Sequence, residues 1–255
     1  KEELKSLHIP ENAIAITPVN GYLKSPIDSI NNLDEIYFDD NLEGSELKSF
    51  FIDGKIESLR INGMAKTTYH VFEDSIYRAK NNASGDTIIM QFNNNELTQL
   101  NIIGGSTGEY HPDSISNDME YPIIYSANKI QYRFLEKESD FEGQAIIKHD
   151  KTHLEAGFIN VNWNNHILNA LPKLENDSIN IPLLPIIKEE GKDPMVGDEM
   201  VYNLKSKKGK IKKGKTKADD GYYTGNQIKN QSENVFFIEN STYTTCDLDT
   251  AHFHF

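Results

Sequence analysis

The sequence holds a single cysteine, Cys246, among its 255 residues, and it has no long apolar run. One cysteine excludes a disulfide framework within the chain and any zinc site built from several thiolates. The longest apolar run, residues 181–187, includes two prolines. The sequence therefore shows the pattern of neither a transmembrane helix nor a signal peptide.

Basic residues are also scarce. The sequence has 26 Lys and Arg against 39 Asp and Glu, which gives a formal net charge of -13 at pH 7. Because binding to phosphates along a nucleic acid needs a dominant basic surface, we do not expect nucleic acid as a partner of the whole chain.

The two ends of the sequence lead us to expect a fragment of a longer protein. The chain opens at Lys1, without an initiating methionine. Its last residues, 252–255, alternate imidazole and phenyl side chains in the manner of a strand. We expect the parent protein to continue beyond them.

Hydrophobic residues are present in a proportion typical of a folded protein. They make up 37% of the sequence, with 12 Tyr and 12 Phe, which is too much for a disordered chain. Apolar and polar positions alternate with a period of two, as in β-strands, over residues 47–52, 55–61, 129–134 and 199–204. Helical stripes are scarce, and the one modest helix candidate is residues 2–7. We therefore predict an all-β fold.

An internal repeat supports this fold class. Residues 44–69 align without gaps on residues 85–110, an offset of 41 residues that places Gly63 on Gly104. Each copy has the pattern of a hairpin, with its turn at residues 53–54 or 93–95, where Gly and Asn tolerate a positive φ.

A looser similarity relates residues 127–158 to residues 197–228. The intervening residues 171–194 contain four of the nine prolines, which predicts a long loop rather than a central strand. Hairpins that bury one face poorly on their own have to stack. We therefore expect an elongated β-jelly roll or solenoid with an open edge, to which another chain adds a strand.

Two short motifs have the residues of a chemical site. The run from His149 to His153 has the spacing of a zinc-protease motif, but that motif works only on a helix, where both histidines share a face. We favour a hairpin turn with two exposed imidazoles. The glycine-rich residues 104–108 lack the Gly-Lys-Ser/Thr of a phosphate loop, which favours a turn or bulge before Tyr110.

Two further segments leave alternatives open. Residues 246–254 gather a thiol, carboxylates and imidazoles, which suits a metal site or a Cys–His nucleophile, or equally a strand whose His252 and His254 face solvent. Residues 205–217 carry eight lysines and no acid. They fit a hairpin that meets phosphorylated head groups or an anionic membrane, or, as we favour, charged edge strands that block aggregation.

Adjacent acids raise an alternative function. The pairs Asp39-Asp40 and Asp219-Asp220 suggest the acid and base of a carbohydrate-active protein. Neighbouring residues on a strand point to opposite faces, so neither pair converges on one substrate. We predict no enzyme activity, no catalytic residue, no metal and no cofactor, and we keep a carbohydrate-binding or adhesive β-solenoid as the alternative.

Two motifs in residues 202–255 carry a family resemblance. A strand-turn-strand run ends in YTTCD at residues 243–247, and GYYTG precedes it at residues 221–225. This stretch resembles the N-terminal periplasmic domain of the LptD (OstA) family of lipopolysaccharide-assembly outer-membrane proteins. Residues 130–163 are similar to the upstream part of that domain, and residues 34–110 resemble the repeated hairpins of OstA-like, LptA-type periplasmic proteins.

The resemblance implies a fold, a location and a function. The fold is a folded-sheet β-jelly roll of stacked antiparallel hairpins, with LptA-like repeats over residues 1–115 and an LptD-like jelly roll over residues 116–255. The location is the periplasm at the outer membrane of a Gram-negative bacterium, ahead of a membrane barrel absent from this sequence. The function is a lipid-binding conduit that passes lipopolysaccharide to an outer-membrane translocon.

The resemblance also implies partners and a disulfide. The partners are lipopolysaccharide, an LptA-type bridge protein or a second copy joined by strand addition, and an LptE-type outer-membrane lipoprotein. The family joins this domain to its barrel through disulfides, which implies that Cys246 pairs with a cysteine in the missing barrel. A further N-terminal cysteine of the family pattern is not seen.

The apolar positions of the predicted strands give a candidate lipid path, because a container for acyl chains needs one apolar face. We expect this path to be lined by Ile130, Tyr132, Phe134, Ile147, Leu154, Phe158, Met200, Tyr202, Leu204, Phe236 and Ile238.

Overall fold

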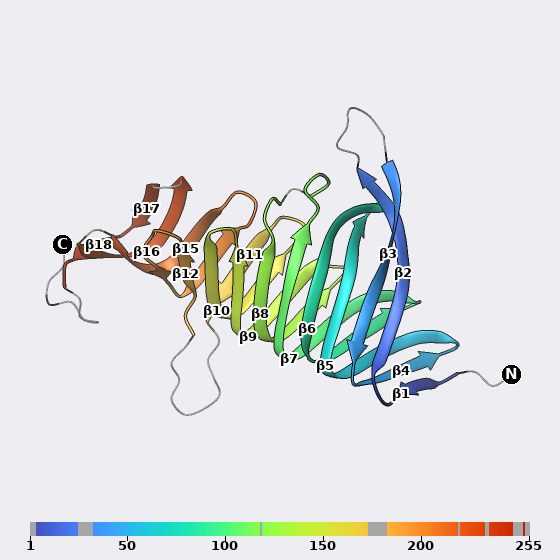
Figure 1. Ribbon diagram of the computed structural model, residues 1–255. Coiled ribbons are helices and arrows are strands. Elements are labelled where there is room, and N and C mark those ends of the chain that lie inside the picture. The colour runs from blue at the N-terminus through green and yellow to red at the C-terminus, as the bar shows by residue number, and fades with distance from the viewer. Residues whose placement is uncertain are drawn as a thin grey trace, which may run out of the picture. The chain divides into compact units, whose positions relative to one another are not determined.

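A computed structural model describes residues 4–24, 33–117, 119–172, 183–218, 220–232, 235–246 and 252 (Figure 1). These residues form β-strands joined by tight turns, and no helix occurs among them. The all-β class predicted from the period of two is therefore confirmed. Within the described ranges, no helix is long and apolar enough to span a membrane. The chain divides into two compact units, residues 1–138 and residues 139–255.

Unit 1 is built from long antiparallel strands. Its described strands are β1 (Ser6–Ile9), β2 (Ala13–Lys24), β3 (Leu33–Gly44), β4 (Glu46–Ile52), β5 (Lys55–Glu73), β6 (Ile76–Asn93), β7 (Glu96–Pro112) and β8 (Ile123–Arg133). β5, β6, β7 and β8 pair in chain order. The first half of β5 also pairs with β4, and its second half pairs with β3. On their other edges, β4 pairs with β1 and β3 pairs with β2. The two halves of β5 thus have different neighbours, so the sheet folds over between them.

The predicted repeat is visible in the backbone. Both predicted hairpin turns are present, and Asp53, Gly54, Asn94 and Asn95 all have a positive φ between 49° and 71°. Two successive positive φ values are the signature of the type I′ turn, which matches the twist of the strands it joins. The glycine-rich residues 104–108 form a bulge rather than a turn, because β7 runs through them to Tyr110 with a register shift between Ile103 and Ser106.

A row of isoleucines crosses the core of unit 1. Ile61 on β5 lies opposite Ile88 on β6, which lies opposite Ile102 on β7. Ile102 in turn lies opposite Ile130 on β8, and all four side chains are fully buried. Burial of one such side chain contributes about 1.5–3 kcal/mol, so this row is a main source of stability for unit 1.

Unit 2 repeats the arrangement with shorter strands. They are β9 (Glu138–His149), β10 (Thr152–Asn162), β11 (Ile167–Leu171), β12 (Ile186–Glu189), β13 (Met195–Val196), β14 (Glu199–Asn203), β15 (Lys208–Ala218), β16 (Gly221–Ser232), β17 (Val235–Glu239) and β18 (Thr242–Thr244). β9 pairs with β10, and β15 pairs with β16. Three strands pair with a different strand along each half. The first halves of β10, β15 and β16 pair with β12, β14 and β18. Their second halves pair with β11, β13 and β17.

The helix candidate at residues 2–7 is wrong over its described part. Residues 1–3 lie outside the described residues, residues 4–5 have no regular structure, and Ser6–Ile9 forms β1. A six-residue helix leaves most of its backbone groups without an internal partner. Antiparallel pairing with β4 supplies those partners instead.

The long loop predicted over residues 171–194 is only partly correct. Residues 173–182 lie outside the described residues, and Ile186–Glu189 forms β12, which pairs with β10 and β13. Pro172, Pro185 and Pro194 each flank a strand, so none of them removes a ladder hydrogen bond from the interior of a strand. The boundary between the two units follows Glu138. The assignment of residues 1–115 and 116–255 to two family domains stays a prediction.

Candidate functional site

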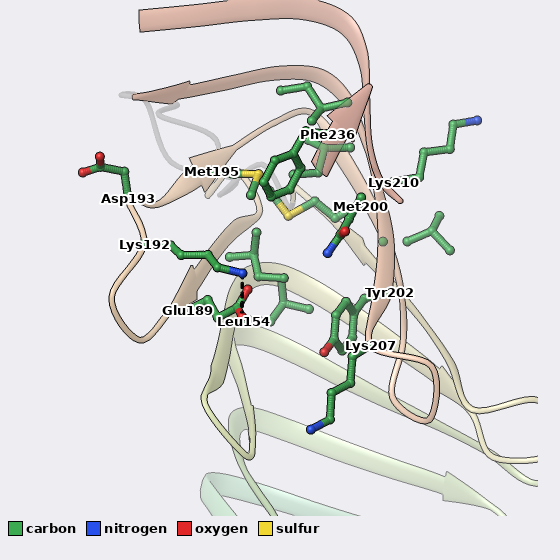
Figure 2. Close-up of a pocket in the computed structure, with 16 residues that line it drawn as sticks. Leu154, Glu189, Lys192, Asp193, Met195, Met200, Tyr202, Lys207, Lys210 and Phe236 are labelled. Carbon is green, nitrogen blue, oxygen red and sulfur yellow. Dashed lines mark hydrogen bonds and ion pairs between the residues drawn. The ribbon is translucent and has the colours of Figure 1, made fainter. Parts of the chain in front are cut away.

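Unit 2 contains a hollow that is partly open to solvent (Figure 2). Its lining is mainly apolar and comes from strands far apart in the sequence. The apolar residues are Leu154 on β10, Ile187 on β12, Met195 on β13, Met200, Val201 and Tyr202 on β14, Ile211 on β15, Ile228 on β16 and Phe236 on β17.

The back of the hollow is a continuous apolar row. Met200 lies opposite Ile211, and Ile211 lies opposite Ile228, all three of them buried. The row continues to the half-buried Ile238 on β17. Because side chains alternate along each strand, the residues on either side of these positions point to the opposite face.

Two methionines make the lining adaptable. Figure 2 shows Met195 and Met200 close to the ring of Phe236. Methionine is unbranched and polarizable, so it fills an irregular space and repacks around different apolar groups. Met195 and Phe236 are only half-buried, which leaves this side of the hollow accessible.

The rim of the hollow is charged. Lys192 Nζ lies 2.9 Å from Glu189 Oε1, and Lys207 Nζ lies 2.5 Å from Asp150 Oδ2. The Tyr202 hydroxyl lies 3.3 Å from Thr152 Oγ1, and burial raises the pKa of Tyr202, so its phenol is neutral at pH 7. An apolar interior under a polar rim suits a ligand with one apolar and one polar end.

The histidine motif lies beside this rim. The predicted hairpin turn is confirmed at Asp150 and Lys151, between β9 and β10. The prediction of two exposed imidazoles is wrong, since His149 is only 4% exposed and His153 is half-buried. His149 shares the inner face of β9 with Ala145 and Ile147, four and two residues earlier. Burial, and next the charge of Lys207, lower the pKa of His149, which favours its neutral form.

The structure distributes the predicted lipid-path residues over both units. Ile130 and Tyr132 are buried in unit 1, and Phe134 is half-buried there. The remaining eight lie in unit 2, where Leu154, Met200, Tyr202 and Phe236 line the hollow, Ile147 and Leu204 are buried, and Phe158 and Ile238 are half-buried. Contact of any of these residues with a lipid stays a prediction.

Five apolar lining residues were missed by the sequence analysis. One is Val201, which lies between the predicted Met200 and Tyr202 on β14. Ile211 and Ile228 follow the same strand alternation as the predicted positions, so their period of two was an available signal. Ile187 and Met195 lie in the proline-rich segment. Strands of four and two residues are too short to show a period.

The lysine-rich residues 205–217 form the turn after β14 and most of β15. β15 pairs with β14 and β13 along one edge and with β16 along the other. The favoured interpretation of these residues as charged edge strands is therefore wrong, because the chain returns as β16 and covers the second edge.

Of the two acidic pairs, the structure describes only Asp39-Asp40 in full, and these two side chains do not converge. Asp39 is exposed and Asp40 is half-buried, as expected for neighbours on β3. Asp40 Oδ1 accepts a hydrogen bond of 2.8 Å from the backbone N–H of His70. The same oxygen lies 2.8 Å from Nδ1 of the His70 ring. Asp219 lies outside the described residues, and Asp220 is exposed.

The region around Cys246 is described only in part. Cys246 is half-buried, and its backbone N–H donates to Thr244 Oγ1 at 3.0 Å. His252 is exposed, while residues 247–251 and 253–255 lie outside the described residues. Within the described part of the chain, no three His, Cys, Asp or Glu side chains gather as metal ligands. The disulfide of Cys246 therefore stays a prediction.

The comparisons with known proteins give one structural likeness. No protein-family model matches the chain, and no curated protein sequence shows significant similarity to it. Among solved structures it is similar to LptH from Pseudomonas aeruginosa, the LptA-homologous periplasmic component of the lipopolysaccharide transport device. The match has a TM-score of 0.45 and 12% identity, and it covers 59% of this chain and 94% of LptH. The fold given above is taken from the strand pairings of this chain itself.

Proposed function

We propose that this chain is a periplasmic lipid-binding conduit that passes lipopolysaccharide toward an outer-membrane translocon. The observation that carries the proposal is the hollow of unit 2, in which an apolar row from Met200 to Ile228 lies under a charged rim. The resemblance of residues 202–255 to the LptD family supports lipopolysaccharide as the cargo.

The apolar character of the lining suits acyl chains. Moving one methylene group from water to an apolar surface stabilises a complex by about 0.8 kcal/mol. A chain of about a dozen carbons therefore has several kcal/mol of driving force even when only half of it is covered. Binding of this kind needs no reaction chemistry, and a partly open hollow lets the lipid leave again.

The rim suits the polar end of the same molecule. Lys192 and Lys207 are already paired with Glu189 and Asp150, so the rim is polar with little excess charge. Sugars and phosphates of the head group would stay at this rim in contact with water, because their burial without partners costs several kcal/mol.

Partners are proposed from open strand edges. β2 pairs with β3 along its whole length, and its other edge meets β6 at one position only, Tyr22 opposite Ile76. Among the described residues the rest of that edge, residues 13–21, has no strand neighbour. We propose that an LptA-type bridge protein or a second copy adds a strand there. An LptE-type lipoprotein and a downstream barrel that holds Cys246 are proposed on the family resemblance alone.

A photo-crosslinking experiment tests the lipid path. Photo-reactive residues at Met195 and Phe236, both half-buried in the hollow, should capture lipopolysaccharide, whereas one at the exposed Lys148 on β9 should not. Equal labelling at all three positions would contradict the proposal.

A further inference from the structure

We propose that the outer face of β15, β16 and β17 docks on the surface of an anionic lipid bilayer. The docking residues are Lys208, Lys210, Lys229 and Phe237, which we call the lysine face. The proposal does not depend on the cargo of the hollow, because the side chains of the lysine face alternate with those of the apolar row along the same strands.

The strand register builds this face. Lys210 on β15 lies opposite Val201 on β14 and opposite Lys229 on β16, and Lys229 lies opposite Phe237 on β17. Directly opposite residues of an antiparallel pair share a face. Each member of this row is one residue away from a member of the apolar row, so the two rows point in opposite directions. Val201 and Lys210 both border the hollow, but Figure 2 shows the Lys210 side chain extending away from its centre.

The pairing of Lys210 with Lys229 is unfavourable for folding. Like charges directly opposite each other on neighbouring strands destabilise a sheet. Nearby lysines of β15 are paired: Lys212 lies 3.2 Å from Glu199, and Lys213 lies 2.8 Å from Asp198. Lys208, Lys210 and Lys229 have no acidic partner among the described residues. An unneutralised cationic row in a chain of net charge -13 indicates an anionic partner.

Phe237 decides the kind of partner. Its side chain is 58% exposed beside Lys229, and Val235 on the same face of β17 is 49% exposed. A soluble phosphate offers nothing to an exposed ring and a valine on one surface. The bases of a nucleic acid could stack on the ring, but the net charge of -13 disfavours this partner. A bilayer offers both an apolar layer for these side chains and anionic head groups for the lysines, whose long stems let their charged ends reach the head groups.

The charge on this side of the sheet remains positive when its acids are counted. The next row holds Glu199, Lys212, Gln227 and Glu239. The two glutamates therefore face four lysines, one of which already pairs with Glu199. An ammonium group near an anionic membrane surface strengthens binding by about five-fold at low salt.

Vesicle co-sedimentation tests the proposal. The protein is mixed with vesicles of phosphatidylcholine alone or with phosphatidylglycerol added, both free of lipopolysaccharide. We expect binding to the anionic vesicles only, weakened by salt. Substitution of both Lys210→Gln and Lys229→Gln should reduce the affinity about 25-fold, and Phe237→Ser should reduce it several-fold.

Two control variants sharpen the test. Lys66→Gln with Lys148→Gln removes the same charge from exposed positions elsewhere and should leave the affinity within about two-fold. Phe236→Ser alters the hollow next to Phe237 and should not change vesicle binding. The proposal is overturned by absence of binding to anionic vesicles, by equal losses in the control variants, or by a short oligonucleotide that competes as well as the vesicles. Because its failure concerns vesicles and not lipopolysaccharide capture, it is separable from failure of the lipid conduit.

Discussion

Gly63 on β5 and Gly104 on β7 occupy equivalent positions of the sequence repeat and adopt nearly the same positive φ, 79° and 81°. Each is followed by a second residue of positive φ, Met64 or Gly105, and each marks a shift in strand register. The repeated bulge bends the long strands of unit 1 at one level, which lets β3 and β4 pair with different halves of β5.

The bulge predicts an unequal response of two adjacent glycines. A Cβ at Gly104 would collide with the Asp86 carboxylate, whereas a Cβ at Gly105 meets nothing nearby. Both have a positive φ, so both alanine variants are strained. We expect Gly104→Ala to lower the free energy of unfolding by about 2–3 kcal/mol and Gly105→Ala by about 1 kcal/mol, measured by urea denaturation. Equal losses would show that the contact with Asp86 is unimportant.

The apolar row of unit 2 predicts a large stability effect at its centre. Ile228 is fully buried between Ile211 and Ile238, so Ile228→Ala should cost about 2–5 kcal/mol through lost burial and the cavity left behind. Ile238 is half-buried at the end of the row, and Ile238→Ala should cost clearly less. Thermal unfolding of both variants measures the difference, and an equal cost would count against this row as a core element.

Phe236 and Phe237 predict opposite binding defects, because neighbouring residues on β17 point to opposite faces. Phe236→Ser should weaken binding of a fluorescent acyl probe several-fold and leave binding to anionic vesicles unchanged. The adjacent Phe237→Ser should do the reverse. Titration of both variants against both ligands checks this, and a shared loss of both activities would mean that the two faces are not separate surfaces.

His149 predicts a loss of stability on acidification. Its pKa is lowered in the folded state, chiefly by burial, so the unfolded state binds more protons as the pH falls below about 6.5. The free energy of unfolding should therefore decrease from pH 7 to pH 5. His149→Gln should flatten this decrease, and the remaining slope reflects groups such as His153, whose pKa is also lowered by burial. The midpoint of thermal unfolding at both pH values measures it, and an unchanged slope would refute the assignment.

The free edge of β2 predicts where a partner strand pairs. The Tyr22 N–H donates to Ser75 O and not to β3, so even-numbered residues of β2 point their backbone groups to the outer edge. Ile16→Pro should then abolish association with a second copy or an LptA-type protein without disturbing the β2–β3 ladder. Ala15→Pro should break that ladder and destabilise unit 1. Undiminished association of a folded Ile16→Pro variant would exclude this edge.

The family resemblance predicts that Cys246 forms a disulfide with a cysteine of a downstream barrel. In an oxidising compartment a lone thiol needs a designated partner, and this chain has no second cysteine. Non-reducing electrophoresis of the full-length protein should show a mobility difference between wild type and Cys246→Ser. An identical mobility would leave Cys246 a structural thiol.

The sequence alone determined the local structure of this protein. Alternation placed Ile130, Met200 and Tyr202 on inner faces, because a strand repeats every two residues whatever its neighbours are. The turns at residues 53–54 and 94–95 were equally readable, since Gly and Asn accept the positive φ that a two-residue hairpin requires.

Only the tertiary structure decided which strands share their edges. Ile187 and Met195 line the hollow because β12 pairs with β10 and β13 pairs with β15. The sequence of such short strands does not show which strand they pair with. The lysines of residues 205–217 were plain in the sequence, but a shift of register by one residue would turn every side chain to the other face. Long-range backbone pairing therefore set Lys210 opposite Lys229 and Met200 opposite Ile211, and with them the two faces of the sheet.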